Sequence, residues 1–83
     1  MPKPSPEPLS DVTREFGRRV QQRRAELGLT QEVAAERIGV HWTYLGQVER
    51  GRRNVSLHNI VRIAEGLEID PARFVEYLRN WHY

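Results

Sequence analysis

The side chains best suited to chemistry gather between residues 30 and 54, and their types favour binding over catalysis. A short helix is predicted over residues 42–49, with Leu45 and Val48 on its inward face. Its outward positions are Trp42, Thr43, Gly46 and Gln47, and a basic loop follows with Arg50, Arg52, Arg53 and Asn54. Guanidinium groups suit bidentate contacts with phosphates and base edges, so this region predicts a surface that binds anions or nucleic acid.

Catalytic and metal-binding chemistry has no comparable support. The chain has no cysteine, and its three histidines, His41, His58 and His82, share no metal-ligand spacing. The carboxylates are scattered over predicted helix faces, and no Ser, His and Asp arrangement lies near a Gly-rich elbow. We therefore expect a protein that is not an enzyme and that holds no metal or cofactor.

Five helices account for the apolar pattern, and no segment alternates like a strand, so the sequence predicts an all-α fold. The first helix starts at Ser10 or Asp11 and runs to about Leu27, and the second runs from the Thr30 cap to about Ile38. Ser56 caps a fourth helix, whose predicted apolar face is Leu57, Ile60, Val61, Ala64 and Leu67. A fifth helix starts at Asp70 and Pro71 and carries Phe74, Val75, Tyr77, Leu78 and Trp81.

The second and third helices are joined by a short turn that contains Gly39. Such a pair can pack at a steep angle, with the small Ala34 at the crossing. Val40 supports Leu45 and Val48 in anchoring the third helix against the second.

The chain divides into two parts. Residues 1–9 hold four of the five prolines and predict a disordered arm, and residues 10–83 predict one small domain.

The net charge is only +2, although 12 of the 13 basic residues are Arg. No apolar run approaches the ~20 residues of a membrane span, and the amino terminus lacks the core of a signal peptide. These features predict a soluble cytoplasmic protein.

Residues 16–78 resemble the phage-repressor-like helix-turn-helix regulators known as the Xre family. The resemblance rests on Gly28-Leu29-Thr30-Gln31-Glu32, Ala34-Ala35, Ile38-Gly39-Val40, Val48-Glu49-Arg50-Gly51 and Ser56-Leu57, in the family's order and spacing. The segments 41–46 and 54–60 look most like controller proteins of restriction-modification systems. Those proteins typically have Arg where this chain has Trp42, so their operator sequence is not transferable.

The resemblance implies that the third helix enters the major groove of DNA. The side chains then directed to bases are Trp42, Thr43, Gln47 and, beside the backbone or a flexible step, Tyr44. Gln47 can pair bidentately with adenine, Thr43 can offer its hydroxyl or methyl group, and Trp42 can pack on thymine methyls. The alternative places Trp42 and Tyr44 in the core, but Leu45 and Val48 already fill the inward face.

The family pattern also implies which residues hold phosphates and which hold the fold. Phosphate contacts are expected from Gln31, Arg50, Arg52, Arg53 and Asn54. Isolated charge runs are usually only solvated, but the neighbouring helix pair favours phosphate binding here. Arg24 and Glu49 match a pair that forms an internal salt bridge in this family.

The carboxyl-terminal residues allow two interpretations. Phe74, Leu78 and Trp81 follow one stripe that could close the core of a monomer, whereas Val75, Tyr77 and Tyr83 are left near the surface. The family implies a homodimer, because two half-sites about one helical turn apart are needed for affinity. We therefore predict a dimer interface made of Phe74, Val75, Tyr77, Leu78 and Trp81.

The expected function is a nucleoid-associated transcriptional regulator that binds a palindromic operator in double-stranded DNA. RNA polymerase is a further partner to consider, and no small-molecule ligand is expected. Two alternatives stay open at this point. The same fold could serve as a protein-interaction module that meets DNA only through a partner, or as the antitoxin of a toxin pair, and the net charge of +2 argues only modestly against the former.

Overall fold

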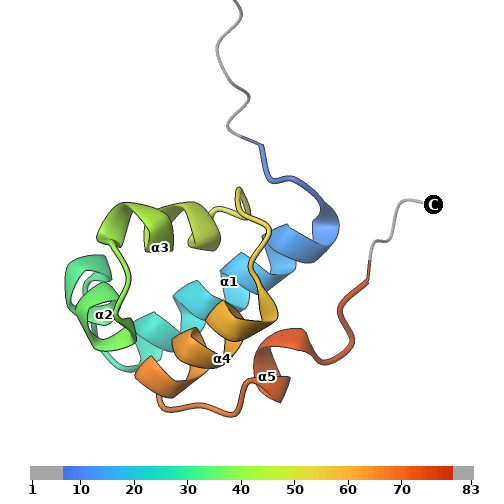
Figure 1. Cartoon of the computed structure of the whole chain (residues 1–83). Helices are drawn as coiled ribbons and strands as arrows, with labels where there is room; N and C mark the ends of the chain where they lie inside the picture. Colours follow the sequence, from blue (N-terminus) through green and yellow to red (C-terminus); the bar gives the residue numbers. More distant parts are fainter. Residues whose placement is uncertain (1–6, 80–83) are drawn as a thin grey trace, which may run out of the picture.

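The computed structural model describes residues 7–79, and within that range the chain forms five helices and no strand (Figure 1). The helices are α1 (Asp11–Glu26), α2 (Gln31–Ile38), α3 (Trp42–Glu49), α4 (Leu57–Gly66) and α5 (Ala72–Val75). The predicted all-α fold with paired helices two and three is confirmed.

Side-chain caps start the first four helices. Ser10, Thr30 and Ser56 each accept a hydrogen bond from a backbone N–H three residues later, as the sequence predicts. Ser10 and Thr13 bond reciprocally, with the Thr13 hydroxyl 3.0 Å from the Ser10 backbone nitrogen. His41 caps α3, because its Nδ1 accepts the Thr43 backbone N–H at 3.2 Å. These caps explain why four helix starts could be located from sequence.

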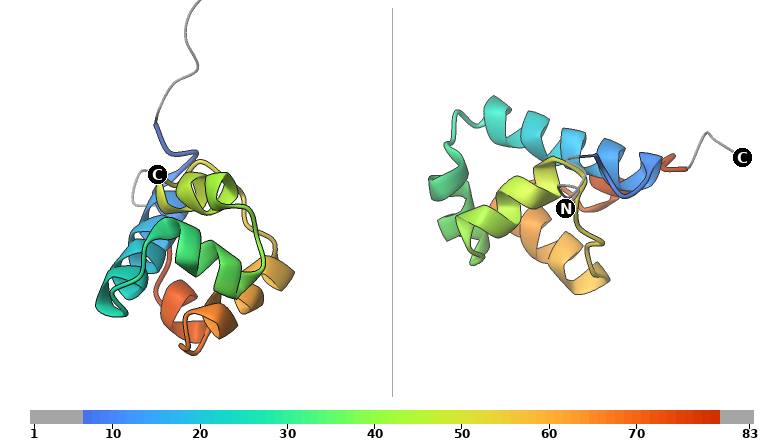
Figure 2. Two further views of the ribbon diagram at one scale, coloured as in Figure 1. Left: turned by 90° about the vertical axis from the view of Figure 1, so that its left-hand side faces the viewer. Right: turned by 90° about the horizontal axis from the view of Figure 1, so that it is seen from above.

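The α3 helix lies along the upper edge of the molecule in Figure 1, and the views in Figure 2 place it against both α1 and α2. Leu45 and Val48 are its buried hydrophobic residues, as predicted, with 0% and 1% of their surface exposed. They join a core whose other buried members are Phe16, Val20, Ala34, Ala35, Ile38, Ile63, Ala64, Leu67 and Phe74. This packing fixes α3 from below and leaves its outer side uncovered.

Two glycines set the position of α3. Gly39 ends α2 in the left-handed conformation, with φ of 88°, so the chain can turn tightly into α3. Gly17 lies where α1 passes the carboxyl end of α3, and a Cβ there would lie 2.6 Å from the carbonyl oxygen of Glu49. A side chain at Gly17 would therefore push the two helices apart.

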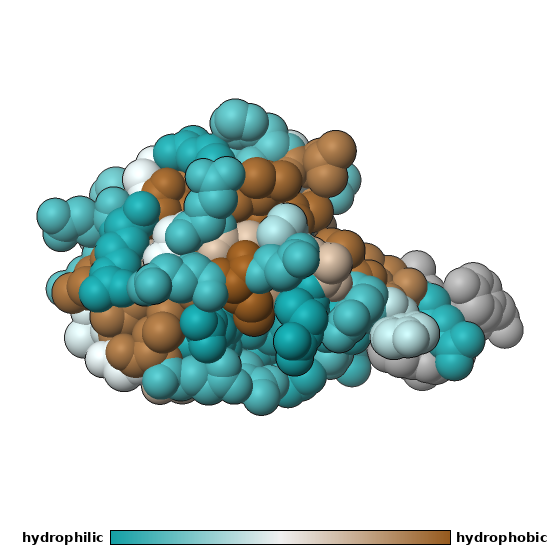
Figure 3. All heavy atoms as spheres, turned by 90° about the horizontal axis from the view of Figure 1, so that it is seen from below, coloured by the Kyte–Doolittle hydropathy of each residue, from teal (hydrophilic) through white to brown (hydrophobic). Residues whose placement is uncertain are grey.

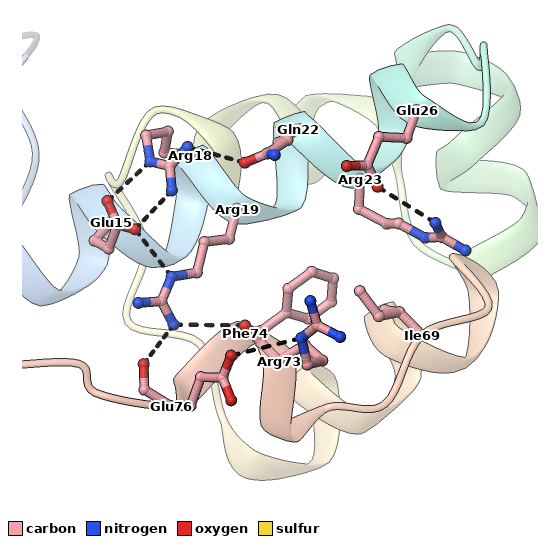
Figure 4. Close-up of a pocket in the computed structure, with 10 residues that line it drawn as sticks. All are labelled: Glu15, Arg18, Arg19, Gln22, Arg23, Glu26, Ile69, Arg73, Phe74 and Glu76. Atoms are coloured by element: carbon pink, nitrogen blue, oxygen red, sulfur yellow. Dashed lines mark hydrogen bonds and ion pairs between the residues drawn. The ribbon is translucent and has the colours of Figure 1, made fainter.

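The fifth helix is much shorter than the sequence pattern predicts. It ends at Val75, Glu76 is extended, and Tyr77 takes a left-handed conformation with φ of 59°. The guanidinium of Arg19 in α1 donates a 2.7 Å hydrogen bond to the carbonyl oxygen of Glu76 (Figure 4). In a longer helix this carbonyl oxygen would accept a backbone N–H from the next turn instead. The predicted helical stripe to Leu78 and Trp81 is wrong for Leu78, and Trp81 lies outside the described residues.

The predicted apolar face of α4 is also only partly buried. Ala64 and Leu67 are in the core together with Ile63, which the prediction omitted. Leu57 and Val61 are 77% and 37% exposed. Periodicity marks the apolar side of a helix, but it does not show how much of that side a small domain can cover.

The chain before α1 is attached to the rest of the domain through Leu9. The Leu9 backbone N–H donates to the carbonyl oxygen of Gly51 at 2.9 Å, so the predicted free arm does not extend to residue 9. Residues 1–6, where most of that arm was predicted, lie outside the described residues. Among residues 7–79, no helix is long and apolar enough to cross a membrane, and no cluster of side chains could hold a metal ion.

Candidate DNA-binding surface

The first turn of α3 presents two of the predicted base-contacting side chains to solvent. Trp42 is 50% exposed, and its ring stacks on the His41 ring with centroids 5.8 Å apart. Thr43 is also exposed, and its hydroxyl lies 2.7 Å from His41 Nδ1. Trp42 is therefore a surface residue, and the amino-terminal end of α3 offers an apolar ring and a hydroxyl side by side.

The other two predicted base-contacting residues, Tyr44 and Gln47, are half-buried and joined by Arg53. The Arg53 guanidinium carbon lies 5.0 Å from the centre of the Tyr44 ring, and its Nη1 donates a 3.1 Å hydrogen bond to Gln47 Oε1. On the other side, Asn59 Nδ2 donates to the Tyr44 hydroxyl at 3.1 Å. Side chains from α3, the following loop and α4 thus form one connected polar surface.

Gln31 and Gly46 both contact neighbouring side chains within the domain. Gln31 Nε2 donates to Glu49 Oε1 at 3.0 Å, so the side chain predicted to hold a phosphate is already hydrogen-bonded within the domain. Gly46 is buried rather than outward, because the side chains of Gln31 and Arg50 pass within 3.4 Å of where its Cβ would be. A methyl group at this position would therefore be in van der Waals contact with both side chains, and the predicted outward position of Gly46 is wrong.

Arg24 and Glu49 form the internal ion pair that the family pattern implied. Arg24 Nε and Nη2 donate to the two carboxylate oxygens of Glu49 at 2.6 and 2.9 Å, and Nη1 donates to the carbonyl oxygen of Leu29. Only 3% of the Glu49 side chain is exposed. The hydrogen bond to Glu49 raises the pKa of Arg24 above its ordinary value, and the ion pair ties α1 to α3.

The loop after α3 carries basic side chains with no acidic partner. Within residues 7–79, the side chains of Arg50, Arg52 and Asn54 make no hydrogen bond or ion pair, and Arg53 bonds only to the neutral Gln47 apart from its stacking on Tyr44. Arg50, Arg53 and Asn54 are exposed, and Arg52 is half-buried. This loop concentrates positive charge next to the outer side of α3, although the whole chain carries a net charge of only +2.

The surface between α1 and α5 forms a second hollow. A shallow hollow of about 240 Å³ lies between α1 and α5 and is lined mainly by charged residues (Figure 4). Its arginines are already paired: Arg18 and Arg19 both bond Glu15, Arg23 bonds Glu26 and Arg73 lies 3.5 Å from Glu76. With the charges compensated in this way, the hollow offers no free cation to an anionic ligand.

The predicted dimer residues within the described range fall into three groups, and Trp81 lies outside that range. Phe74 is 1% exposed and packs edge to face on Phe16, so it belongs to the protomer core and the prediction of an interface role is wrong. Val75 and Tyr77 are 40% and 89% exposed, and Leu78 is half-buried beside a hollow of about 80 Å³. Figure 3, which shows the molecule from below, has apolar side chains exposed among hydrophilic ones.

Comparison with known proteins agrees with this geometry. The family model described as a helix-turn-helix domain matches residues 15–76. The chain belongs to the helix-turn-helix family of DNA-binding transcriptional regulators. This is a family of regulators rather than of enzymes, and the two helices of its motif are α2 and α3.

Several relatives are restriction-modification controller proteins. The control protein C.BamHI of Bacillus amyloliquefaciens is 38% identical over 63 residues, which are 75% of this chain and 78% of that protein. The structure of the controller protein C.AhdI of Aeromonas hydrophila is 44% identical and covers 75% of this chain and 94% of that one, with a TM-score of 0.73. The controller C.Esp1396I, solved as a tetramer with its natural 35 base-pair operator, is 30% identical with a TM-score of 0.74, over 81% of this chain and 88% of that one.

Sequence reasoning missed two residues of this surface, His41 as a cap of α3 and Asn59 as a support for Tyr44. His41 precedes a predicted helix start, so its capping role had a local signal in the sequence. Asn59 had none, because its contact with Tyr44 spans 15 residues and depends on how α4 packs.

Proposed function

We propose that this protein binds a specific DNA operator with α3 in the major groove. The observation that carries this proposal is the location of Arg50, Arg52 and Arg53, which have no acidic partner among residues 7–79 and lie beside the outer side of α3. Cations without partners can neutralise phosphates on either side of a groove, which fixes the protein's position on the duplex. Trp42, Thr43 and Gln47 would then face the base edges.

We infer that the operator-bound form is a symmetric homodimer. One helix of eight residues contacts few base pairs, so two copies on half-sites about one helical turn apart are needed for useful specificity. Val75 and Tyr77 form an exposed apolar patch that a second copy could cover, and Leu78 lies beside it. Such an interface would leave both α3 helices free.

The likeness to three controller proteins supports a narrower role as the controller of a restriction-modification operon. In this role the protein acts without catalysis at its promoter in the nucleoid, where it would block or recruit RNA polymerase. Its activity would be set by its own concentration, through dimer formation and operator occupancy. The exposed arginines without acidic partners among residues 7–79 favour a polyanion such as DNA over the protein-interaction alternative.

The test is selection from a random pool of double-stranded DNA, followed by measuring the mass of the complex formed on the enriched sequence. We expect a two-fold symmetric motif bound by two chains. Val75→Arg should weaken binding to the full motif and leave binding to a single half-site unchanged, because it places a charge in the proposed interface.

Two results would contradict the proposal. If no motif is enriched while a single stoichiometric protein partner is captured, the domain is an interaction module. If the complex contains one chain and Val75→Arg behaves like the parent protein, the dimer through the carboxyl-terminal segment is wrong.

A further inference from the structure

The hydrogen bond between Arg53 and Gln47 changes what Gln47 can offer to a base. A free carboxamide presents one acceptor and one donor group, which together match the N6 amino group and N7 of adenine. Here the acceptor, Gln47 Oε1, already receives the Nη1 proton of Arg53 at 3.1 Å. Oε1 keeps its second lone pair, but the Gln47 amino group and the remaining guanidinium N–H groups now make donors predominant in the pair.

Arg53 is held in this position by contacts other than its bond to Gln47. Its guanidinium carbon lies 5.0 Å from the centre of the Tyr44 ring, and the electron-rich face of an aromatic ring attracts a cation. The Tyr44 hydroxyl is fixed by Asn59 in α4 at 3.1 Å. No carboxylate of residues 7–79 bonds to Arg53, so none of them competes with Gln47 for the guanidinium.

We propose that Arg53 determines base specificity by holding Gln47, so that the pair contacts guanine rather than adenine. Guanine presents two acceptors in the major groove, O6 and N7, and both match the donors of the pair. Adenine presents its N6 amino group, a donor, which would lie beside the guanidinium cation and compete with it for Gln47 Oε1. This inference rests on the proposed function, since it requires α3 to lie in the major groove.

The proposal reverses the expectation from sequence alone, in which Gln47 pairs with adenine and Arg53 holds a phosphate. The difference arises from a contact that spans six residues and joins a helix to the loop that follows it. Arg53 is here a positioning residue for Gln47 as well as a donor in its own right.

The experiment repeats the DNA selection with four proteins: the parent, Gln47→Ala, Arg53→Met and Arg52→Met. Gln47→Ala identifies the base position that Gln47 contacts, because preference is lost there. Arg53→Met removes the guanidinium and keeps an unbranched side chain of similar reach, and Arg52→Met is the matched control for losing one positive charge from the same loop.

At the position relaxed by Gln47→Ala, the parent should prefer guanine over adenine by about tenfold, the ratio expected for one good bidentate contact. Arg53→Met should reverse that preference, because the freed carboxamide can pair with adenine. Arg52→Met should bind every duplex more weakly and keep the preference for guanine. A merely structural role of Arg53 would lower affinity without exchanging one base for another.

The proposal is overturned if the parent prefers adenine at this position, or if Arg53→Met retains the preference for guanine. In either case an enriched symmetric motif would leave the proposed function intact. If the parent enriches no motif, the proposed function fails and this inference fails with it. The two failures are therefore distinguishable in one set of selections.

Discussion

The arginines of this small domain fall into two regions that differ in how their charge is compensated. On the side of α1 and α5, Arg18, Arg19 and Arg73 lie 2.8–3.5 Å from carboxylates of the same helix or its extension. In the loop after α3, Arg50 and Arg52 have no acidic partner among residues 7–79. The first set is neutralised within the fold, and the second is available for a polyanion.

This difference explains why the net charge was a poor guide to function. The net charge of +2 is a sum over the charge-balanced surface of α1 and α5 and the basic loop after α3. Only the structure shows that the two are separate. The comparison also predicts a separation of effects. Replacing a paired arginine should change the free energy of unfolding, whereas replacing an arginine without a partner should change the affinity for DNA.

The largest effect is expected at the most buried pair. Arg24→Met should lower the free energy of unfolding by about 3–5 kcal/mol, because the Glu49 carboxylate would be left buried without its cation. Urea unfolding followed by circular dichroism measures this loss. The double variant Arg24→Met with Glu49→Gln should be less destabilised than the single one, since the stranded charge is gone. Arg18→Met is the control for an exposed pair. A similar loss in the free energy of unfolding there would contradict the expectation that the buried pair contributes more.

A smaller effect is expected where the two regions meet. Gly17→Ala places a methyl group against the backbone of Val48 and Glu49 and should lower the free energy of unfolding by about 1–3 kcal/mol. Since it displaces the carboxyl end of α3, binding to the selected operator should weaken as well. Gly28→Ala is a useful control, because its Cβ would meet nothing within 4 Å and only its φ of 69° is strained. Unchanged operator affinity in folded Gly17→Ala would mean that the position of α3 is not set here.

The smallest effect concerns pH. Hydrogen bonds from Arg18 and Arg19 lower the pKa of Glu15 from 4.5 to about 2. The stabilising contribution of Glu15 is therefore fully present above pH 4.5 and is lost as pH falls through about 2. Solvent screening limits it to about 1 kcal/mol or less, because the group lies near the surface. Unfolding measured across this pH range should show a steeper loss for the parent than for Glu15→Gln, and parallel curves would argue against the pair.

The starts of four helices and the arrangement of α2 and α3 could be predicted because their determinants are local. Ser10, Thr30 and Ser56 act within one helical turn, and Leu45 and Val48 follow the helical period. Gly39 needs only its own backbone conformation to end α2. Signals of this kind are complete within a few residues of sequence.

The features that could not be predicted depend on contacts between distant segments. The helix α5 ends early where Arg19, 57 residues away, bonds the carbonyl oxygen of Glu76. Gln31 turns inward because Glu49 is there to accept its hydrogen bond. The apolar pattern of α4 did not predict that Leu57 would be exposed, because a pattern does not specify which other element packs on each apolar side chain.

The most direct test of the account compares two double variants that each lose two positive charges. Arg50→Met with Arg52→Met removes arginines that have no acidic partner among residues 7–79, and Arg18→Met with Arg73→Met removes paired ones. The measurement is the Kd for one duplex over a range of salt concentrations. The first variant should flatten the slope of log K against log salt by about 1.8 units, from about 0.9 per phosphate contact, and the second should leave it unchanged. Equal slopes for the two variants, or a larger change in the second, would contradict the assignment of the DNA-binding surface to α3 and the loop that follows it.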